Sequence, residues 1–97
     1  MSTCVVVGRV VSATPATNPN GKPMVRVIIE ESRGFGEKIY KTRFGVEVYG
    51  NGADTARALN PGDIVKAVGE VRAYVSDGKD GKQYANLTLS MANVERI

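Results

Sequence analysis

The sequence predicts an all-β domain: a five-stranded Greek-key barrel with one short helix between the third and fourth strands. Three observations predict this class. Apolar and polar residues alternate in several runs, which is the period-two pattern of half-buried strands. Clusters of Gly, Pro, Asn and Asp separate the runs and indicate turns. Only Ala53–Leu59 has the composition of a short helix, whereas a doubly wound α/β fold would need a helix after nearly every strand. This order of elements is that of an OB-fold.

The first two strands are expected at Cys4–Val11 and Met24–Glu31. The first is rich in valine, which favours extended backbone, and Gly8 within it predicts a bend or a bulge. Residues 12–23 are expected to form a loop, in which Asn20-Gly21 is a hairpin-turn signal. In the second strand the outer face is marked by Arg26 and Glu30, and the core positions are Val25, Val27 and Ile29.

The third strand, Lys41–Tyr49, has the clearest alternation in the chain. It follows a glycine-containing loop, Ser32–Lys38, and it ends at Gly50. One face is apolar and the other is charged and partly aromatic, so the strand is expected to be buried on one side only. The outward residues are Lys41, Arg43, Gly45, Glu47 and Tyr49, and the inward residues are Thr42, Phe44, Val46 and Val48.

The fourth and fifth strands are expected to form a hairpin. Ile64–Tyr74 is the fourth strand, Ser76–Gly81 forms an exposed turn, and the fifth strand begins near Gln83. In the fifth strand the expected inward residues are Leu87, Leu89 and Met91, and the expected outward residues are Asn86, Thr88 and Ser90.

Length and composition predict one domain, residues 1–97, without a linker or a repeat. Cys4 cannot form an internal disulfide on its own and is expected to be a small buried hydrophobe, which fits a cytoplasmic location.

No apolar run has the length of a membrane span, and no signal peptide follows Met1. Thirteen Lys and Arg against ten Asp and Glu give a net charge of +3, which permits a polyanionic partner without requiring one.

The chemistry expected is binding rather than catalysis. The chain has no His and shows no nucleophile–base pair and no carboxylate dyad, so it is not expected to be an enzyme. It lacks a set of metal ligands, and we expect neither a metal nor any other cofactor. The glycines around Phe35 do not form a phosphate-binding loop, because no helix follows them.

Five short motifs occur in one order along nearly the whole chain. They are the opening strand Val5–Val11, the turn Pro19–Gly21, the strand end Val46–Gly50, the turn Pro61-Gly62 after the helix, and Val65–Arg72. No single motif is specific, but the ordered set resembles the bacterial and phage single-stranded DNA-binding protein (SSB) family. The resemblance implies an OB-fold that binds single-stranded DNA in replication, recombination or repair, as a homodimer or homotetramer.

The resemblance assigns three aromatic positions. Tyr49 matches the family's aromatic residue at the end of the third strand, Phe35 falls close to a loop aromatic that stacks on bases, and Tyr74 lies near another. The chain departs from the family at Arg43, where the family carries a tryptophan, although a guanidinium can also stack on bases. It also ends at 94–97 without the acidic tip that recruits replication and repair proteins in bacterial SSBs, which argues against a full hub protein.

A binder of single strands needs aromatic side chains interleaved with cations along a groove, because single strands expose flat bases and closely spaced phosphates. The expected aromatic contacts are Phe35, Tyr49, Tyr74 and Tyr84, and the expected basic contacts are Arg33, Lys38, Lys41, Arg43, Arg72, Lys79 and Lys82.

Alternatives remain open for these residues and for the function. Tyr49 also suits a core position, Tyr84 also suits a cross-strand pair with Tyr74, and each lysine singly suits a solvated loop. A second hypothesis is an OB-fold adaptor similar to the primosomal protein PriB, which acts mainly through a replication protein. A third is an oligomeric barrel whose outer face contacts only protein. Whether the aromatic residues share an exposed groove discriminates among them.

Overall fold

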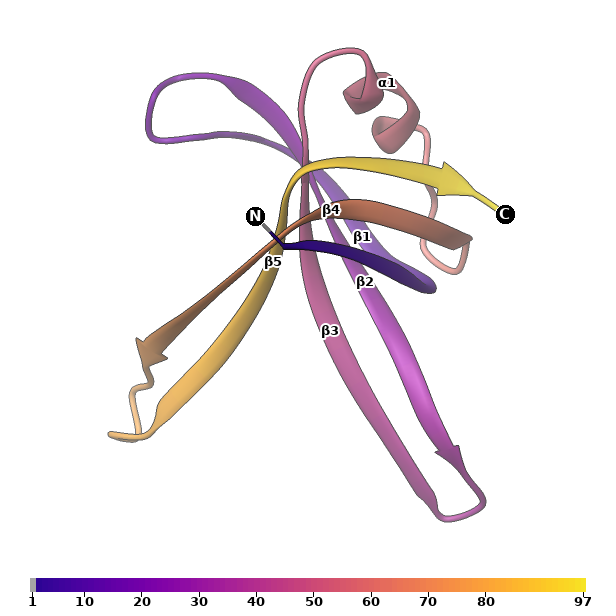
Figure 1. Ribbon diagram of the computed structural model, residues 1–97, viewed down its shortest axis with the longest axis vertical. Helices are drawn as coiled ribbons and strands as arrows, with labels where there is room; N and C mark the ends of the chain where they lie inside the picture. Colours follow the sequence, from indigo (N-terminus) through magenta and orange to yellow (C-terminus); the bar gives the residue numbers. More distant parts are fainter. Residues whose placement is uncertain (1) are drawn as a thin grey trace.

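The five strands close into a barrel in the order β1-β2-β3-β5-β4, as Figure 1 shows. The computed structural model describes residues 2–97, apart from the side chains of residues 33, 35, 40, 74, 76 and 84–86. The predicted five-stranded OB-fold, with its helix between the third and fourth strands, is confirmed. The elements are β1 Thr3–Thr17, β2 Pro23–Phe35, β3 Lys38–Val48, α1 Gly52–Arg57, β4 Ile64–Asp77 and β5 Gln83–Arg96.

The first strand serves two neighbours, and this closes the barrel. Residues 3–9 of β1 pair with β4 and residues 9–17 pair with β2, in both cases antiparallel. The register shifts between Val10 and Ser12, beyond the glycine at which the sequence predicts a bend. Gly8 instead permits a close approach, because a Cβ at this position would lie 2.6 Å from the backbone oxygen of Glu30. A short parallel pairing of β3 with β5 at Gly45 and Val46 completes the barrel.

The core is formed by the inward faces that the alternation predicts. Val25, Val27 and Ile29 of β2 are fully buried, and they pack with the inward valines of β3. Helix α1 lies over one end of the barrel (Figure 1), where its alanines 53 and 56 are buried with Leu59. Cys4 packs against this core but is only half-buried, so the expectation of full burial is wrong.

Four strands are longer than predicted. β1 continues to Thr17 within the expected loop, β4 reaches Asp77, β2 includes residues 32–35, which were expected to be a loop, and β3 begins at Lys38 rather than Lys41. In each case an antiparallel partner supplies ladder hydrogen bonds that outweigh turn-prone local composition; Gly34, for example, pairs with Ile39. Figure 1 shows the β2–β3 and β4–β5 hairpins as arms that diverge from the barrel.

The expected pattern of β5 fails at a bulge. Leu89 is 1% exposed as predicted, but Met91, which was expected to face inward, is 71% exposed. Leu87 lies before the bulge, opposite Ala73 in the β4–β5 arm, and is exposed there, and the expected outward residue Ser90 is buried. Val68 pairs with Asn93 whereas Glu70 pairs with Ser90, so two β5 residues lie opposite Gly69. This extra residue reverses the inward and outward sides of the strand beyond it.

No helix among residues 2–97 is long and apolar enough to cross a membrane.

Candidate nucleic-acid interface

The outer face of β3 carries polar and charged side chains along the barrel surface, as its alternation predicts. Lys41 and Arg43 are exposed, and Tyr49, directly after the strand, is half-buried. Arg43 and Tyr49 are six residues apart, which corresponds to roughly 20 Å of extended strand. Gly45 lies between them and has no side chain, so nothing projects from the face at this position. On the neighbouring strands, Gly45 is aligned with Thr88 of β5, and Thr88 is aligned with Arg72 of β4.

One end of this face holds three cations around one carboxylate, and we call these four residues the Glu30 cluster. Arg9 of β1, Glu30 of β2 and Arg43 of β3 are direct neighbours in the strand register. A guanidinium nitrogen of Arg9 donates to Glu30 Oε1 at 3.2 Å, and Arg43 Nε donates to Glu30 Oε2 at 3.1 Å. The Lys41 ammonium lies 3.8 Å from Glu30 Oε1.

The Glu30 carboxylate is enclosed by its partners. It points to the outer face as predicted, yet Glu30 is only 6% exposed because three long side chains surround it. The hydrogen bond from Arg43 lowers the pKa of Glu30 below its ordinary value of 4.5; burial opposes this, and Arg9 and Lys41 lower it further. At neutral pH the cluster therefore has two positive charges in excess, beside a shallow hollow that reaches Pro61 and Gly62.

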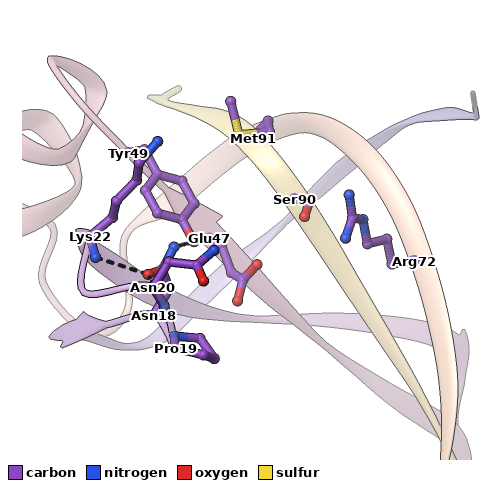
Figure 2. Close-up of a pocket in the computed structure, with 9 residues that line it drawn as sticks. All are labelled: Asn18, Pro19, Asn20, Lys22, Glu47, Tyr49, Arg72, Ser90 and Met91. Atoms are coloured by element: carbon purple, nitrogen blue, oxygen red, sulfur yellow. Dashed lines mark hydrogen bonds between the residues drawn. The ribbon is translucent and has the colours of Figure 1, made fainter.

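The other end of the face is a groove around Tyr49, which we call the Tyr49 groove (Figure 2). Its volume is about 360 Å³, in the range of ligand-binding pockets. Asn18 Nδ2 donates to the Tyr49 hydroxyl at 3.4 Å, and Asn18 Oδ1 accepts the backbone N–H groups of Asn20 and Lys22, both at 2.9 Å. The loop is thereby held against the ring. The lining residues are Asn18, Pro19, Asn20, Lys22, Glu47, Tyr49, Arg72, Ser90 and Met91.

The groove can accommodate a flat apolar group beside charged ones. The Tyr49 ring and the Met91 thioether offer apolar surface, and Arg72 and Lys22 supply positive charge. Glu47 is the acidic residue of the lining, and the Arg26 guanidinium lies 3.3 Å from its Oε2, which partly neutralises it.

The structure brings together some of the predicted site residues. Tyr49 and Arg72 line one groove, and Lys41 and Arg43 share the Glu30 cluster. Lys38 is exposed at the start of β3, and Lys79 and Lys82 are exposed at the β4–β5 turn; none of these three lysines lines either hollow. The predicted contacts whose side chains lie outside the described residues are Arg33, Phe35, Tyr74 and Tyr84.

The backbone register shows how Tyr84 lies relative to Tyr74, its possible partner across the hairpin. Tyr74 pairs with Asn86 and Ser76 pairs with Tyr84, so the two tyrosines are not directly opposite in the β4–β5 hairpin. Tyr84 lies two residues from the position opposite Tyr74, a diagonal neighbour that aromatic side chains can reach, so their pairing stays a prediction.

Sequence reasoning missed several residues of these sites, among them Arg9, Asn18 and Met91. Arg9 is an isolated charge within an apolar strand, and that isolation is a signal that it faces outward with a partner. Asn18 lies in a segment expected only to be a loop, although Asn side chains commonly bond to backbone two residues ahead. Met91 was misplaced because the alternation was continued past Leu89, although Leu89 and Val94 are an odd number of residues apart and cannot share one face without a bulge.

Comparison with known proteins identifies the type of OB-fold. No protein-family model matches the chain, and no curated protein sequence matches it significantly. Among solved structures, it is similar to Plasmodium falciparum SSB in complex with ssDNA, with 16% identity, a TM-score of 0.72 and coverage of 100% of this chain and 95% of that one. The fold is an SSB-type OB-fold.

A second solved structure has a similar fold. The small single-stranded DNA-binding protein from Streptomyces coelicolor has 16% identity and a TM-score of 0.71, and the alignment covers 99% of this chain and 89% of that one. The similarity to both proteins extends over essentially the entire barrel, including the hairpins. At this level of identity it establishes the SSB-type fold.

Proposed function

We propose that this protein binds single-stranded DNA without strong sequence preference, along the outer face of β3. The observation that carries the proposal is the position of Tyr49 and Arg72 in one open groove, with the Glu30 cluster on the same face. Aromatic rings stack on any base, and cations attract any phosphate, so this combination favours single strands without reading sequence. The SSB-type fold supports the proposal.

In this proposal the two ends of the face have different roles. The Tyr49 ring stacks on a base, and Arg72 contacts an adjacent phosphate. The Glu30 cluster attracts the backbone further along, because its three cations exceed its one carboxylate. Lys38, Lys79 and Lys82 are further exposed cations on the two hairpin arms, and Asp77 and Asp80 lie beside the latter two. Phe35, Tyr74, Tyr84 and Arg33 remain predicted contacts on the same hairpins.

We further propose that the protein acts as a homodimer or homotetramer in replication, recombination or repair, in the cytoplasm. One domain with a few stacking and phosphate contacts binds weakly, and linked copies gain avidity. Val5 and Val7 of β1 and Ile64 of β4 are exposed apolar side chains, which suit a contact between protein surfaces. The same surface would serve the alternative, a PriB-like adaptor that contacts a replication protein.

The test is fluorescence anisotropy of a labelled oligo-dT strand, titrated with protein at low and at moderate salt, with duplex DNA as competitor. Binding that weakens with salt and that duplex DNA does not displace is the expected result. Absence of binding at low salt would overturn the proposal and favour the adaptor. Displacement by equal amounts of duplex would show a general affinity for polyanions instead.

A further inference from the structure

Met91 occupies an unusual backbone conformation for its residue type. Its φ is +51°, the one positive φ of a non-glycine residue among the described residues. L-residues rarely adopt this left-handed conformation because the Cβ is crowded, and strain of this kind concentrates at functional sites. The side chain is also 71% exposed, although methionine is apolar. A strained backbone that presents an apolar side chain to solvent requires an explanation.

The bulge in β5 produces this orientation. Without the extra residue, the alternation that buries Leu89 would also turn Met91 toward the core. Gly69 lies opposite the bulge and makes room for it, since a Cβ there would be 2.9 Å from the Ala92 Cβ and 3.1 Å from the Leu89 Cβ. Bulges commonly re-aim a side chain next to a functional site. Here the bulge turns Met91 outward, where it lines the Tyr49 groove (Figure 2).

We propose that Met91 is a base-contacting residue, and that the Tyr49 groove holds one nucleobase between the Tyr49 ring and the Met91 thioether. The inference rests on the proposed single-strand binding and adds a residue and a site to it. A polarizable thioether packs favourably against a flat π-system. Asn18 and Ser90 line the same groove, so the polar edge of the base also meets hydrogen-bonding groups.

The groove favours a base over an apolar protein side chain. Besides the two apolar surfaces it contains Arg72 and Lys22, which suit the phosphates on either side of the base. A buried leucine or phenylalanine from a partner would leave these cations and the Asn18 amide against apolar atoms, which is unfavourable.

The experiment compares two labelled strands of equal length, oligo-dT and an abasic strand that has the phosphates without the bases. Met91→Gly is the main variant, because glycine adopts this φ without strain and the fold is retained. Met91→Leu keeps apolar bulk, and Ile97→Ala is the control, since Ile97 is 73% exposed and lies outside the groove. Affinities are measured by anisotropy over a salt series, and oligomeric state by sedimentation.

We expect Met91→Gly to weaken binding of oligo-dT roughly 2- to 10-fold. Binding of the abasic strand and the salt slope should not change, Met91→Leu should restore most of the affinity, and Ile97→Ala should match wild type. An equal loss on both strands, or no loss on oligo-dT, would overturn the inference while the binding function stands. A change of oligomeric state in Met91→Gly would assign the groove to an interface between copies. Failure of the wild type to bind oligo-dT would overturn both proposals.

Discussion

Arg43 and Glu30 face each other across β3 and β2, and Arg43 Nε donates to Glu30 Oε2 at 3.1 Å. The sequence resemblance to the SSB family predicted a tryptophan at the position of Arg43. The Arg43 side chain is 65% exposed, so it remains open to a ligand, but its guanidinium is held on one side by the carboxylate. Arg43 is therefore part of a charged network on the outer face of β3.

The first prediction concerns stability against acid. The pKa of Glu30 is lowered in the folded protein, so the ionised carboxylate stabilises the fold above the ordinary value of 4.5. That stabilisation is lost as the pH falls through the lowered folded pKa. Glu30→Gln should therefore be less stable than wild type at neutral pH, and the difference should shrink in acid. Urea unfolding of both proteins across the pH range tests this; a constant difference would contradict it.

The second prediction concerns the phosphates that the Glu30 cluster neutralises. Arg43→Ala should reduce the slope of log affinity against log salt by about 0.7 for each phosphate that the variant no longer neutralises. Arg57→Ala on helix α1 is a suitable control, because Arg57 is also an exposed arginine paired with a carboxylate, that of Asp54 at 3.1 Å. It should leave the slope unchanged. Equal slopes for Arg43→Ala and wild type would remove the Glu30 cluster from the binding face.

The third prediction compares the effect on stability of adding a methyl group at two strand glycines, Gly8 and Gly45. A Cβ at Gly8 would lie 2.6 Å from the Glu30 backbone oxygen and 2.7 Å from Ile29 Cγ2, so Gly8→Ala must displace backbone and should cost about 1–3 kcal/mol of unfolding free energy. A Cβ at Gly45 would meet only Thr88 Oγ1 at 3.8 Å, and Gly45→Ala should change stability by roughly 0.5 kcal/mol or less. Urea unfolding measures both. If Gly8→Ala and Gly45→Ala had similar free energies of unfolding, β1 and β2 would be able to separate at Gly8 without cost.

The sequence was sufficient to predict the barrel because the inner faces of its central strands, β2 above all, follow a period of two. Val25, Val27 and Ile29 show this most clearly, since all three are fully buried as predicted. The ends of the strands were not predictable, because residues such as Gly34 are extended only through pairing with a distant strand. Local composition there favours a turn, and tertiary hydrogen bonds overrule it.

The site was predictable only in part, for related reasons. The outward parity of Arg43 and Tyr49 follows from alternation within one strand. The Glu30 cluster requires the register between β1, β2 and β3, which no local pattern contains. The orientation of Met91 depends on one extra residue opposite Gly69. Features that arise from pairing between strands are therefore the ones that sequence reasoning misses.

The fourth prediction separates the ring of Tyr49 from its hydroxyl. The hydrogen bond from Asn18 to this hydroxyl is long, at 3.4 Å, and the loop is independently held by the backbone bonds to Asn18 Oδ1. Tyr49→Phe keeps the ring and should bind oligo-dT within about 2-fold of wild type. Tyr49→Ala removes the stacking surface and should cost about 1–3 kcal/mol of binding free energy, at every salt concentration.

The comparison of these two variants identifies what Tyr49 contributes. Anisotropy titrations give the affinities, and urea unfolding shows whether each variant is folded. If Tyr49→Phe lost as much affinity as Tyr49→Ala, the hydroxyl and its contact with Asn18 would be the binding determinant rather than the ring. If a folded Tyr49→Ala bound like wild type, stacking at this groove would be excluded, and the affinity would have to come from the cations and from the hairpin aromatics.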